Sequence, residues 1–523
     1  MQVNTAQTVI GMGVYFVFIV IVGVWYARRS NRDPASFFLG GRGLGPWVSA
    51  LSAEASDMSG WLLMGLPGVA YFTGVGEAFW TALGLAAGTW INWQIVAKRL
   101  RTYSETAGDS FTLPGFFSNR YHDTRKALSV IAAVLLILFF SIYAGAQFVA
   151  FGKLFDYVVG THRYYALMVL IGAAIVFIYT LLGGFLGESF ADLVQALLMI
   201  SAIILVFAFG VYHVGGVSQV AENLRSFPRF MDIFGIATPV MENGVQAVSG
   251  GRGVFGPGAD YSFLNIVSCL AWGLGYFGMP QVLLRFMAIK QPSKLRQARA
   301  IGVTWCFISL FAAVGIGLLG RAWQPGLLTT AGDAETIFLR MAVTFFPPLL
   351  AGLVLSGILG ASMSSCDSYM LITSSSLAND LMKGWLKKDL SDKAVLWLAR
   401  ASILLVTLFG LFVALTGADS IFRIVSYAWA GLGAAFGPLI LFSLFWKRTT
   451  LAGAAAGMIS GGVTVVLWKN VISKLGGPFT VYELLPAFII SCLAIFAVSL
   501  ATPRPAPDIE REFEQAKAQA ALI

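Results

Sequence analysis

Charged side chains are scarce in this chain of 523 residues. Asp, Glu, Lys and Arg together make up 12% of it, whereas hydrophobic residues make up 57%. In a water-soluble globular protein of average composition, about a quarter of the residues are charged. Composition therefore excludes an ordinary soluble globule and indicates lipid as the main solvent of the chain.

Histidine and cysteine are also rare, with three and four copies. Cys269, Cys306, Cys366 and Cys492 lack CxxC spacing and fall inside apolar runs. We therefore interpret them as small buried hydrophobic residues. With no His/Cys metal cluster, nucleophile motif or specific phosphate-binding loop in the sequence, an enzyme is the least expected class.

Long apolar runs take the place of polar sequence. A helix of about 20 apolar residues crosses a hydrocarbon core about 30 Å thick. Runs of this kind recur along the whole chain, so we expect an all-α membrane protein with about thirteen transmembrane helices. The expected spans are 9–26, 45–71, 78–97, 127–155, 164–182, 188–211, 263–284, 303–319, 342–376, 396–415, 421–445, 451–468 and 482–500.

Basic residues gather in alternate loops between these runs. They form no aromatic-laced basic surface, so the net charge of +9 does not indicate a nucleic-acid partner. By the positive-inside rule the basic loops are cytoplasmic, which predicts a multi-pass bacterial inner-membrane protein with its N-terminus outside and its C-terminus inside. The basic residues are Arg28, Arg29, Arg32 and Arg42; Lys98, Arg99, Arg101, Arg120, Arg125 and Lys126; Arg285, Lys290, Lys294, Arg296 and Arg299; Lys383, Lys387, Lys388 and Lys393; and Lys447 and Arg448.

The segments outside the spans carry little predicted structure. The first run has no basic segment before it, which predicts a retained span rather than a cleaved signal. The longest loop on the outer side, 214–261, is rich in glycine, and we expect a slack connection rather than a mobile cover. The tail after Pro503 is polar and can form a short surface helix from Ile509.

Two of the spans contain polar residues and helix breakers at membrane depth. The second span includes Ser56, Asp57 and Ser59, followed by Gly65 and Pro67. A charged side chain at this depth costs about 3 kcal/mol or more, so such residues normally face a cavity or an ion path. The seventh span is interrupted over 272–280 by three glycines and a proline.

The two interrupted spans stand five apart in chain order. Two five-span blocks that each begin with a broken helix are typical of inverted-repeat transporters, in which the binding site lies at the midplane beside the broken helices. We therefore expect a single transmembrane transporter domain over 1–523, with core repeats at about 45–213 and 261–446. The alternative is that the glycines only permit close helix packing.

The ninth span offers hydroxyl groups that complement the second. Ala361, Ser364 and Ser365 are spaced i, i+3 and i+4 and share one helical face. An unwound second span can present the backbone carbonyls of Ala55 and Met58. Sodium is a hard cation that prefers oxygen ligands, so these groups can form a site. Serines in membrane helices also bond to their own backbone, which is the alternative interpretation.

At this point the chain resembles the sodium:solute symporter family, and within it the branch that carries proline. The resemblance covers nearly the whole chain and rests on four stretches, 40–46, 55–68, 272–280 and 426–438. It implies two inverted five-helix repeats with one leading and two trailing spans, of the LeuT type. It also implies transport of a solute together with Na⁺ by alternating access, without covalent chemistry.

The resemblance assigns roles to particular residues. Sodium would be held by backbone oxygens of Ala55, Met58 and Ala361 and by the hydroxyls of Ser364 and Ser365. Three further groups would couple the ion to transport, namely Asp57, Arg42 and Asp192. L-Proline would be recognised by Tyr143, Trp272, Tyr276 and Pro280, with Ser59 and Gly60 lining the same cavity. The alternatives are another solute, such as pantothenate, a sugar or a sialic acid, or a membrane sensor or channel.

Several polar residues are not assigned by the resemblance. Glu54 stands where the family usually has a small residue, and the sequence leaves open whether it acts on a neighbouring pKa or points to water. Asp367 follows the serine pair on an unsettled face and is left out of the primary site. A last group near predicted span ends is interpreted as interfacial: Glu188, His122, His162 and His213.

Overall fold

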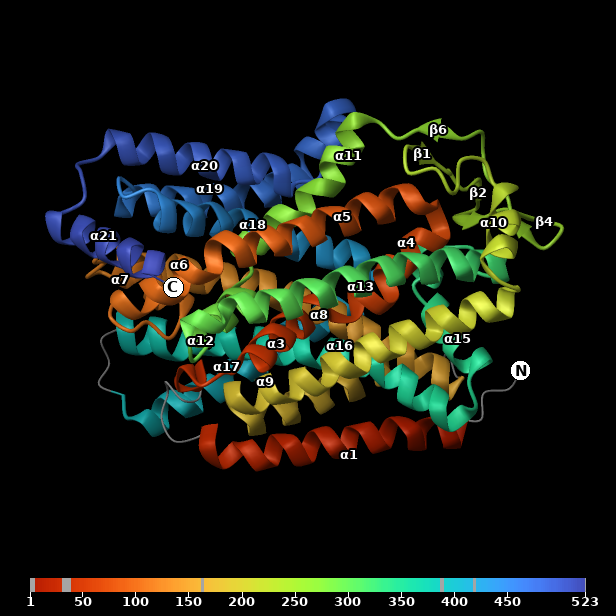
Figure 1. Cartoon of the computed structure of the whole chain (residues 1–523), viewed down its shortest axis with the longest axis horizontal. Helices are drawn as coiled ribbons and strands as arrows, with labels where there is room; N and C mark the ends of the chain where they lie inside the picture. Colours follow the sequence, from red (N-terminus) through yellow and green to blue (C-terminus); the bar gives the residue numbers. More distant parts are fainter. Residues whose placement is uncertain (1–4, 31–38, 161–163, 386–389, 417–419, 523) are drawn as a thin grey trace.

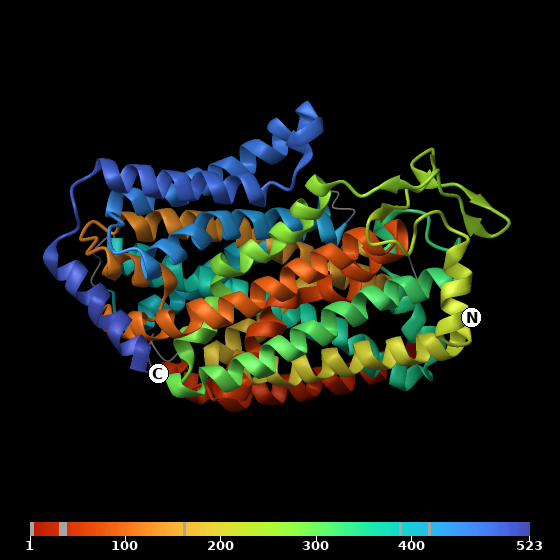
Figure 2. The same ribbon diagram turned by 45° about the horizontal axis from the view of Figure 1, so that its top comes forward.

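A computed structural model describes residues 5–30, 39–160, 164–385, 390–416 and 420–522. Most of these residues form long helices that run side by side in one bundle (Figures 1 and 2). Short β-strands lie at one end of the bundle, which we call the strand end, and helix α21 lies at the opposite end, the α21 end. Helix α1 begins at the strand end.

The elements of the first part of the chain precede the strands. They are α1 (Thr5–Ser30), η1 (Gly40–Arg42), α3 (Pro46–Gly60), η2 (Trp61–Gly65), α4 (Leu66–Thr73), α5 (Val75–Ile91), η3 (Asn92–Val96), α6 (Ala97–Thr106), α7 (Leu113–Arg120), α8 (Ala127–Val159), α9 (Tyr165–Val214) and α10 (Val217–Arg225).

The remaining elements begin with the strands. They are β1 (Gly235–Ile236), β2 (Met241–Glu242), β3 (Val245–Gln246), β4 (Val248–Ser249), β5 (Arg252–Gly253), β6 (Ala259–Asp260), α11 (Phe263–Leu270), η5 (Ala271–Gly278), α12 (Pro280–Ala288), η6 (Pro292–Lys294), α13 (Leu295–Trp323), α14 (Ala331–Ala334), α15 (Ile337–Phe345), α16 (Pro348–Ser375), η7 (Ser376–Trp385), α17 (Asp392–Leu415), α18 (Ile421–Phe445), α19 (Leu451–Asn470), η8 (Ile472–Leu475), η9 (Gly477–Thr480), α20 (Leu484–Ala501) and α21 (Pro507–Leu522).

Nine helices within the described residues are long and apolar enough to cross a membrane, and the bent pair α11/η5 and α12 makes ten. The other three predicted spans fall on helices that are interrupted or shorter. The second is α3, η2 and α4, the third is α5 with η3, and the fifth is the first half of α9.

The predicted interruption of the second span is confirmed. Ser59 has φ 51° and ψ −176°, which ends regular α-helix, and a wide π-helical turn follows at η2. Glycine is required next to it, because a Cβ on Gly60 would lie 2.7 Å from Ser362 Oγ and 3.1 Å from Ala150 Cβ. Helix α4 then restarts with a proline in its first turn.

The predicted interruption of the seventh span is also confirmed. α11 gives way to a 3₁₀ segment, η5, and α12 restarts at Pro280 with a bend of 44°. Pro280 has no N–H to donate and stands at the first position of α12, where none is needed. Glycines allow η5 to approach other helices closely; a Cβ on Gly273 would lie 2.2 Å from the Gly84 carbonyl.

The predicted boundary between the fifth and sixth spans is confirmed, because α9 divides into the apolar helices Tyr165–Leu181 and Gly184–Val214 at Gly184, which has φ 57° and ψ −179°. Another predicted boundary is wrong. The ninth predicted span began at residue 342, but that residue belongs to α15, and α16 begins after the break at Pro347.

The expectation of a slack connection over 214–261 is wrong. Three two-stranded antiparallel sheets form there, β1 with β6, β2 with β3 and β4 with β5. The segment is organised by the guanidinium of Arg321, which is buried 4.7 Å from the Phe255 ring and 5.5 Å from the Phe227 ring. Arg321 also donates to Gln246 Oε1 at 2.8 Å, so this charge pins the loop by cation–π and hydrogen-bond contacts.

The predicted tail helix is confirmed as α21. It begins two residues earlier than expected and packs against α6. Its apolar side chains, including Ile509 and Phe513, are buried, and His122 contacts Glu512 at 3.0 Å. The tail is therefore packed against the bundle through its apolar side chains.

The basic set used for topology needs one correction. Arg285 is not a loop residue; it is fully buried in α12. A hydropathy pattern assigns a charged residue near the end of a span to the adjoining loop. Arg285 instead lies inside the bundle, where it has the buried partners described below. Arg32, Lys387, Lys388 and His162 lie outside the described residues.

Candidate functional site

The predicted sodium ligands meet where α3 and α16 touch. The hydroxyl of Ser364 donates to the carbonyl oxygen of Ala55 at 2.9 Å and to that of Ala361 at 3.1 Å. All three residues are fully buried. The bond to Ala361 is the back-bond of the alternative interpretation, but the bond to Ala55 crosses to the broken helix.

Ser365 and Met58 complete the predicted set. The Ser365 hydroxyl is buried and has no hydrogen-bond partner in the described part of the chain. The Met58 carbonyl lies at the unwound end of α3, where it accepts from the Trp61 N–H. A buried hydroxyl without a partner costs about 1–3 kcal/mol. A cation at this junction would satisfy it, and the neutral oxygen donors have the chemistry that Na⁺ prefers.

Asp57 lies beside the junction and binds other elements. Its Oδ1 accepts from Gln281 Nε2 of α12 at 3.4 Å, and its carbonyl accepts from the Tyr143 hydroxyl of α8 at 3.5 Å. The side chain of Asp57 is 3% exposed. Asp57 thus links α3 to α8 and α12, and within the described residues no hydrogen bond joins it to Ser364 or Ser365.

Four aromatic rings form one stack, which we call the aromatic layer: Trp61, Trp272, Phe422 and Tyr482. The Trp272 ring lies 5.6 Å from Trp61, 5.2 Å from Phe422 and 5.2 Å from Tyr482. The rings come from η2, η5, α18 and the residue pair before α20. Only Trp272 was predicted as a site residue.

Of the other predicted solute residues, Tyr276 is linked to this layer through Trp429. The Tyr276 ring lies 5.2 Å from the Trp429 ring, and the Trp429 indole donates to the Trp272 carbonyl at 2.9 Å. The Tyr143 ring lies 4.4 Å from that of Tyr369. Pro280 is fully buried at the start of α12. Tyr276 therefore lies beside Trp429, whereas Tyr143 contacts Tyr369 of α16 and Asp57 of α3.

Ser59 and Gly60 lie at the broken end of α3. The Ser59 hydroxyl accepts from the Trp61 N–H at 3.2 Å, and the Gly60 N–H donates to Gln147 Oε1 at 3.0 Å. Gln147 is buried and its Nε2 has no hydrogen-bond partner among the described residues. This residue was missed, although an amide within the apolar run 127–155 was a signal for it.

A second polar group, the arginine network, lies at the far end of α3 from the aromatic layer. We define it as Arg285, Glu188, Asp192, Ser52 and Ser368. Arg285 donates to Ser52 Oγ at 2.9 Å, to Ser368 Oγ at 2.9 Å and to Asp192 Oδ2 at 3.1 Å, and it is ion-paired with Glu188. Ser52 also donates to Asp192 at 2.7 Å. The predicted Asp192 thus belongs to a buried ion cluster.

The prediction for Glu188 changes in this region, and the position of Asp367 becomes clear. Glu188 is not interfacial: it is 4% exposed and paired with Arg285. Asp367, left out of the primary site, is buried and lines a small cavity with Glu188. Its Oδ1 accepts from the N–H of Ser368, so it adjoins the arginine network rather than the sodium ligands.

Arg42 lies outside both groups. It donates to Asp109 at 2.8 Å, to Ser104 Oγ at 3.1 Å and to the Met287 carbonyl at 2.7 Å. These bonds join η1 to the end of α12, to Ser104 of α6 and to the segment after α6. The structure therefore does not bring Arg42 together with the predicted sodium ligands.

Glu54 does not point to water. Its side chain is 1% exposed, and its Oε1 accepts from the Trp93 indole at 3.2 Å. It packs beside Gly302 of α13, where a Cβ would lie 2.9 Å from that same oxygen. Of the two possibilities left open by the sequence, solvation is excluded.

At the strand end, the Glu335 carboxylate holds the first turn of α18. It accepts from the N–H groups of Ile421 and Phe422, both at 3.0 Å, and from Ser420 Oγ at 2.8 Å. Lys153 of α8 donates to it at 2.7 Å. A carboxylate at a helix N-terminus is favoured by the N–H groups and the helix dipole. These contacts hold α8, α18 and the segment after α14 together at the strand end, and we call this group of contacts the closure.

This closure predicts the effect of Glu335→Gln. The change removes the negative charge that the three donors and Lys153 share. The lost interactions are about 1.5–3 kcal/mol, which would shift the equilibrium between the intact and the separated contacts about tenfold or more. We expect a cysteine at Ser426, inside the closure, to react with a water-soluble thiosulfonate about tenfold faster in Glu335→Gln than in the parent chain. Asp333→Asn is the control, because that acid bonds Thr330 of its own turn. An unchanged rate in Glu335→Gln would contradict the closing role.

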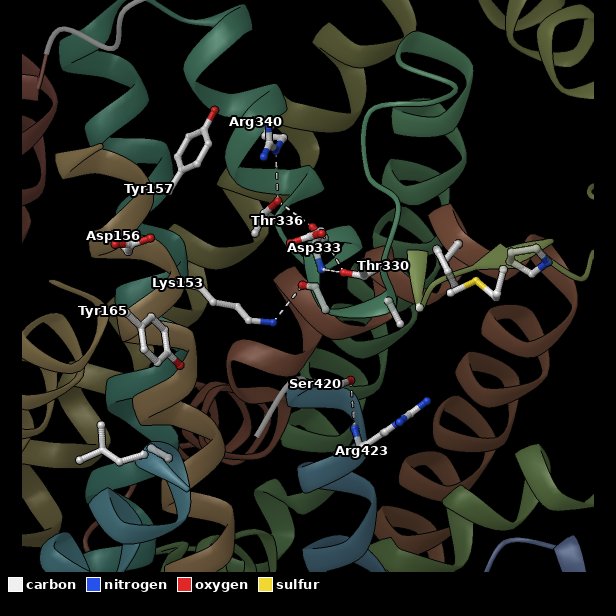
Figure 3. Close-up of a pocket in the computed structure, with 18 of the residues that line it drawn as sticks. Lys153, Asp156, Tyr157, Tyr165, Thr330, Asp333, Thr336, Arg340, Ser420 and Arg423 are labelled. Carbon is white, nitrogen blue, oxygen red and sulfur yellow. Dashed lines mark hydrogen bonds between the residues drawn. The ribbon is translucent and has the colours of Figure 1, made fainter. Parts of the chain in front are cut away.

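A large cavity of about 970 Å³ opens beside this closure, between the bundle and the 238–244 segment. Figure 3 shows Lys153, Asp333, Arg340 and Arg423 among the side chains around it. Acidic and basic groups line the cavity together with apolar side chains such as Phe72 and Met241, so its wall is of mixed polarity.

Comparisons with known proteins agree with this geometry. The model of the Sodium:solute symporter family matches residues 37–461. The High-affinity proline transporter PutP of Bacillus subtilis is 41% identical over 496 residues, 95% of this chain and 98% of that protein. The Osmoregulated proline transporter OpuE of the same organism is 39% identical over 508 residues, 97% of each chain. A Sodium/proline symporter of Staphylococcus aureus is 37% identical over 517 residues, 98% of this chain and 96% of that protein.

Two solved structures share the fold at low sequence identity. A Na⁺-coupled sialic acid symporter in a substrate-bound, outward-open state has a TM-score of 0.73 and 16% identity, over 96% of this chain and 99% of the other. MhsT in complex with L-phenylalanine has a TM-score of 0.52 and 16% identity, over 88% and 99%. The predicted fold class, an all-α membrane protein with a LeuT-type core, is therefore confirmed.

Proposed function

Because this chain belongs to the sodium:solute symporter family, we propose that it imports L-proline together with Na⁺ across the bacterial inner membrane. The family carries solutes on a sodium gradient, and the relatives named above are proline transporters. The observation that supports the proposal best is the contact of Ser364 with the Ala55 carbonyl, which couples an ion-ligand face to a broken helix. The strand end would face outward and the α21 end inward.

In this proposal Na⁺ binds between α3 and α16. The carbonyl oxygens of Ala55, Met58 and Ala361 and the hydroxyls of Ser364 and Ser365 supply five neutral oxygens. Ion binding would hold the broken end of α3 against α16. Asp57 would act from the side, because its bonds reach α8 and α12.

Proline would bind next to the ion, at the broken ends of α3 and η5. Proline is a compact zwitterion with an apolar ring, so it requires an aromatic wall and donors for its carboxylate. Trp272 and Tyr276 offer the wall. The Gly60 N–H, which donates to the Gln147 side chain across the helix break, could donate to the proline carboxylate instead. Pro280 and Tyr143 would complete the cavity.

Transport would follow from rocking of the two repeats, at about 45–213 and 261–446, around this shared site. One positive charge that moves down a potential of 100 mV releases about 2.3 kcal/mol, enough for about fifty-fold accumulation before the sodium gradient is counted. Binding of ion and solute must be mutually favourable for this coupling. The arginine network, including Asp192, would lie on the inward path of the ion.

The test is uptake of radiolabelled L-proline into proteoliposomes with and without an inward sodium gradient. We expect gradient-dependent accumulation in the parent chain and its loss in Trp272→Ala, because the aromatic wall is removed. Trp90→Ala is the matched control, since that ring is 51% exposed on the bundle surface. Proline uptake that is absent or insensitive to the gradient would reject the proposal, and a panel of other solutes would follow.

A further inference from the structure

A second cavity of about 320 Å³ lies between the large cavity and the aromatic layer. We call it the outer cavity. Its walls come from α4, α5, α18 and α19, and Phe422 belongs both to its lining and to the aromatic layer. Ala331 and Arg423 line the outer cavity and the large cavity alike, so the two adjoin. The rings of the aromatic layer therefore separate this space from the proposed proline site.

Four charged side chains line the outer cavity, and two of them have partners. Glu335 is paired with Lys153 and holds the first turn of α18. Lys469 lies 3.5 Å from the Glu483 carboxylate. Their charges are therefore balanced by other side chains of the protein, so neither group requires a ligand in the cavity.

The other two charged groups, Arg423 and Glu77, have no ion pair within the described residues. The guanidinium of Arg423 has no hydrogen bond there either, and in Figure 3 its side chain extends away from Ser420. Glu77 lies in the first turn of α5, where its carboxylate is hydrogen-bonded to Thr73. The two groups have opposite charge, line one cavity and lie close enough for the Arg423 charge to act on Glu77, but they are not within the 4.0 Å of an ion pair.

A ligand that carries both charges would satisfy both residues. A guanidinium binds a carboxylate through charge-assisted hydrogen bonds, and a carboxylate binds an ammonium group in the same way. The rings of Phe72 and Phe422 line the same space and offer an apolar surface. The chemistry of the wall is thus that of a small apolar amino-acid zwitterion, and the cavity has the size of a small-molecule site.

We propose that the outer cavity is a second L-proline site on the entry path, where Arg423 binds the carboxylate and Glu77 binds the ammonium group. The inference rests on the proposed function for the identity of the zwitterion, but its site is separate from the one beside α3 and α16. A proline held here lies against Phe422. It is therefore positioned at the aromatic layer before that layer opens.

The test reads occupancy of the outer cavity directly. A cysteine replaces Ser426, which lines the outer cavity but not the large cavity, and its reaction with a positively charged, water-soluble thiosulfonate is followed in the purified full-length protein without sodium. The parent chain gives the background, which should come from Cys492, because Cys269, Cys306 and Cys366 are buried and Cys492 is partly exposed. The rate is then measured against increasing L-proline, L-prolinamide, which lacks the carboxylate, and N-acetyl-L-proline, which lacks the ammonium group.

We expect L-proline to slow the labelling and the two analogues to be at least tenfold weaker. Arg423→Gln should raise the protecting concentration of L-proline at least tenfold, and Glu77→Gln should do the same. The matched control is Arg340→Gln, a cation that lines only the large cavity and should leave protection unchanged. Equal loss of protection in Arg340→Gln would mean general electrostatic attraction and would overturn the site.

Two further outcomes separate this inference from the proposed function. Absence of protection by L-proline overturns the outer site, whether or not the proteoliposomes accumulate proline. Protection that survives in Arg423→Gln overturns the assignment of that residue. If L-proline protects the cysteine in a way that depends on Arg423 but the proteoliposomes do not accumulate proline, the zwitterion site in the outer cavity is supported. Only the proposed transport of proline is then rejected.

Discussion

Replacing Arg285 by methionine is expected to abolish sodium-driven proline uptake and to destabilise the folded protein by about 3–5 kcal/mol. The guanidinium is fully buried and serves two carboxylates, Glu188 and Asp192, which are themselves 4% and 0% exposed. Methionine has a similar length but no charge, so the two carboxylates would remain in the bundle without a cation. Removal of one partner from a buried ion cluster costs far more than the cluster contributes as a whole.

The measurement pairs uptake in proteoliposomes with thermal unfolding in detergent. A compensated variant, Arg285→Met with Glu188→Gln, Asp192→Asn and Asp367→Asn, leaves no buried carboxylate of this region without a cation and should recover most of the lost stability. If the compensated variant is stable and still fails to transport, the charges act in the cycle and not only in folding. A stable and active Arg285→Met variant would show that the buried cluster is dispensable.

Replacing Ser364 by alanine is expected to raise the sodium concentration for half-maximal uptake by about 10- to 150-fold. The hydroxyl contacts the carbonyls of Ala55 and Ala361, and in the proposed site it would also bind the ion. A hydrogen bond or ligand contact to a charged group contributes about 1.5–3 kcal/mol, which corresponds to that range. The proline concentration for half-maximal uptake should change little at saturating sodium.

The matched control is Ser356→Ala on the same helix. Its hydroxyl is also buried and bonds back to the Gly352 carbonyl at 2.9 Å, but it reaches no other helix. A control variant with the same rise in sodium requirement would mean that any lost back-bond in α16 impairs transport. An unchanged sodium requirement in Ser364→Ala would remove this hydroxyl from the ion site.

The broken helices were predictable because their signal is local. Asp57, Ser59 and Pro67 stand in one short apolar stretch, and each is costly in an uninterrupted membrane helix. The i, i+3 and i+4 spacing of Ala361, Ser364 and Ser365 likewise specifies one helical face. The fold class and the contact between α3 and α16 followed from these local patterns.

The ion clusters were not predictable in this way, because their partners are far apart in sequence. Arg285 and Glu188 are separated by almost a hundred residues, and each lies near a span end, where hydropathy assigns charges to water. The outer loop was misjudged for the same reason. Its glycines suggested slack chain, but Arg321, on a distant helix, determines how Phe227 and Phe255 pack.

The aromatic layer has an optical consequence. Trp61 and Trp272 lie 5.6 Å apart with their planes inclined by 30°, and Trp429 lies 6.4 Å from Trp272. Indole rings this close couple their electronic transitions, so their near-ultraviolet circular dichroism depends on their mutual orientation. Any step that separates the rings changes that signal. The protein therefore contains a native spectroscopic reporter of this layer, and its opening can be followed without attaching a probe.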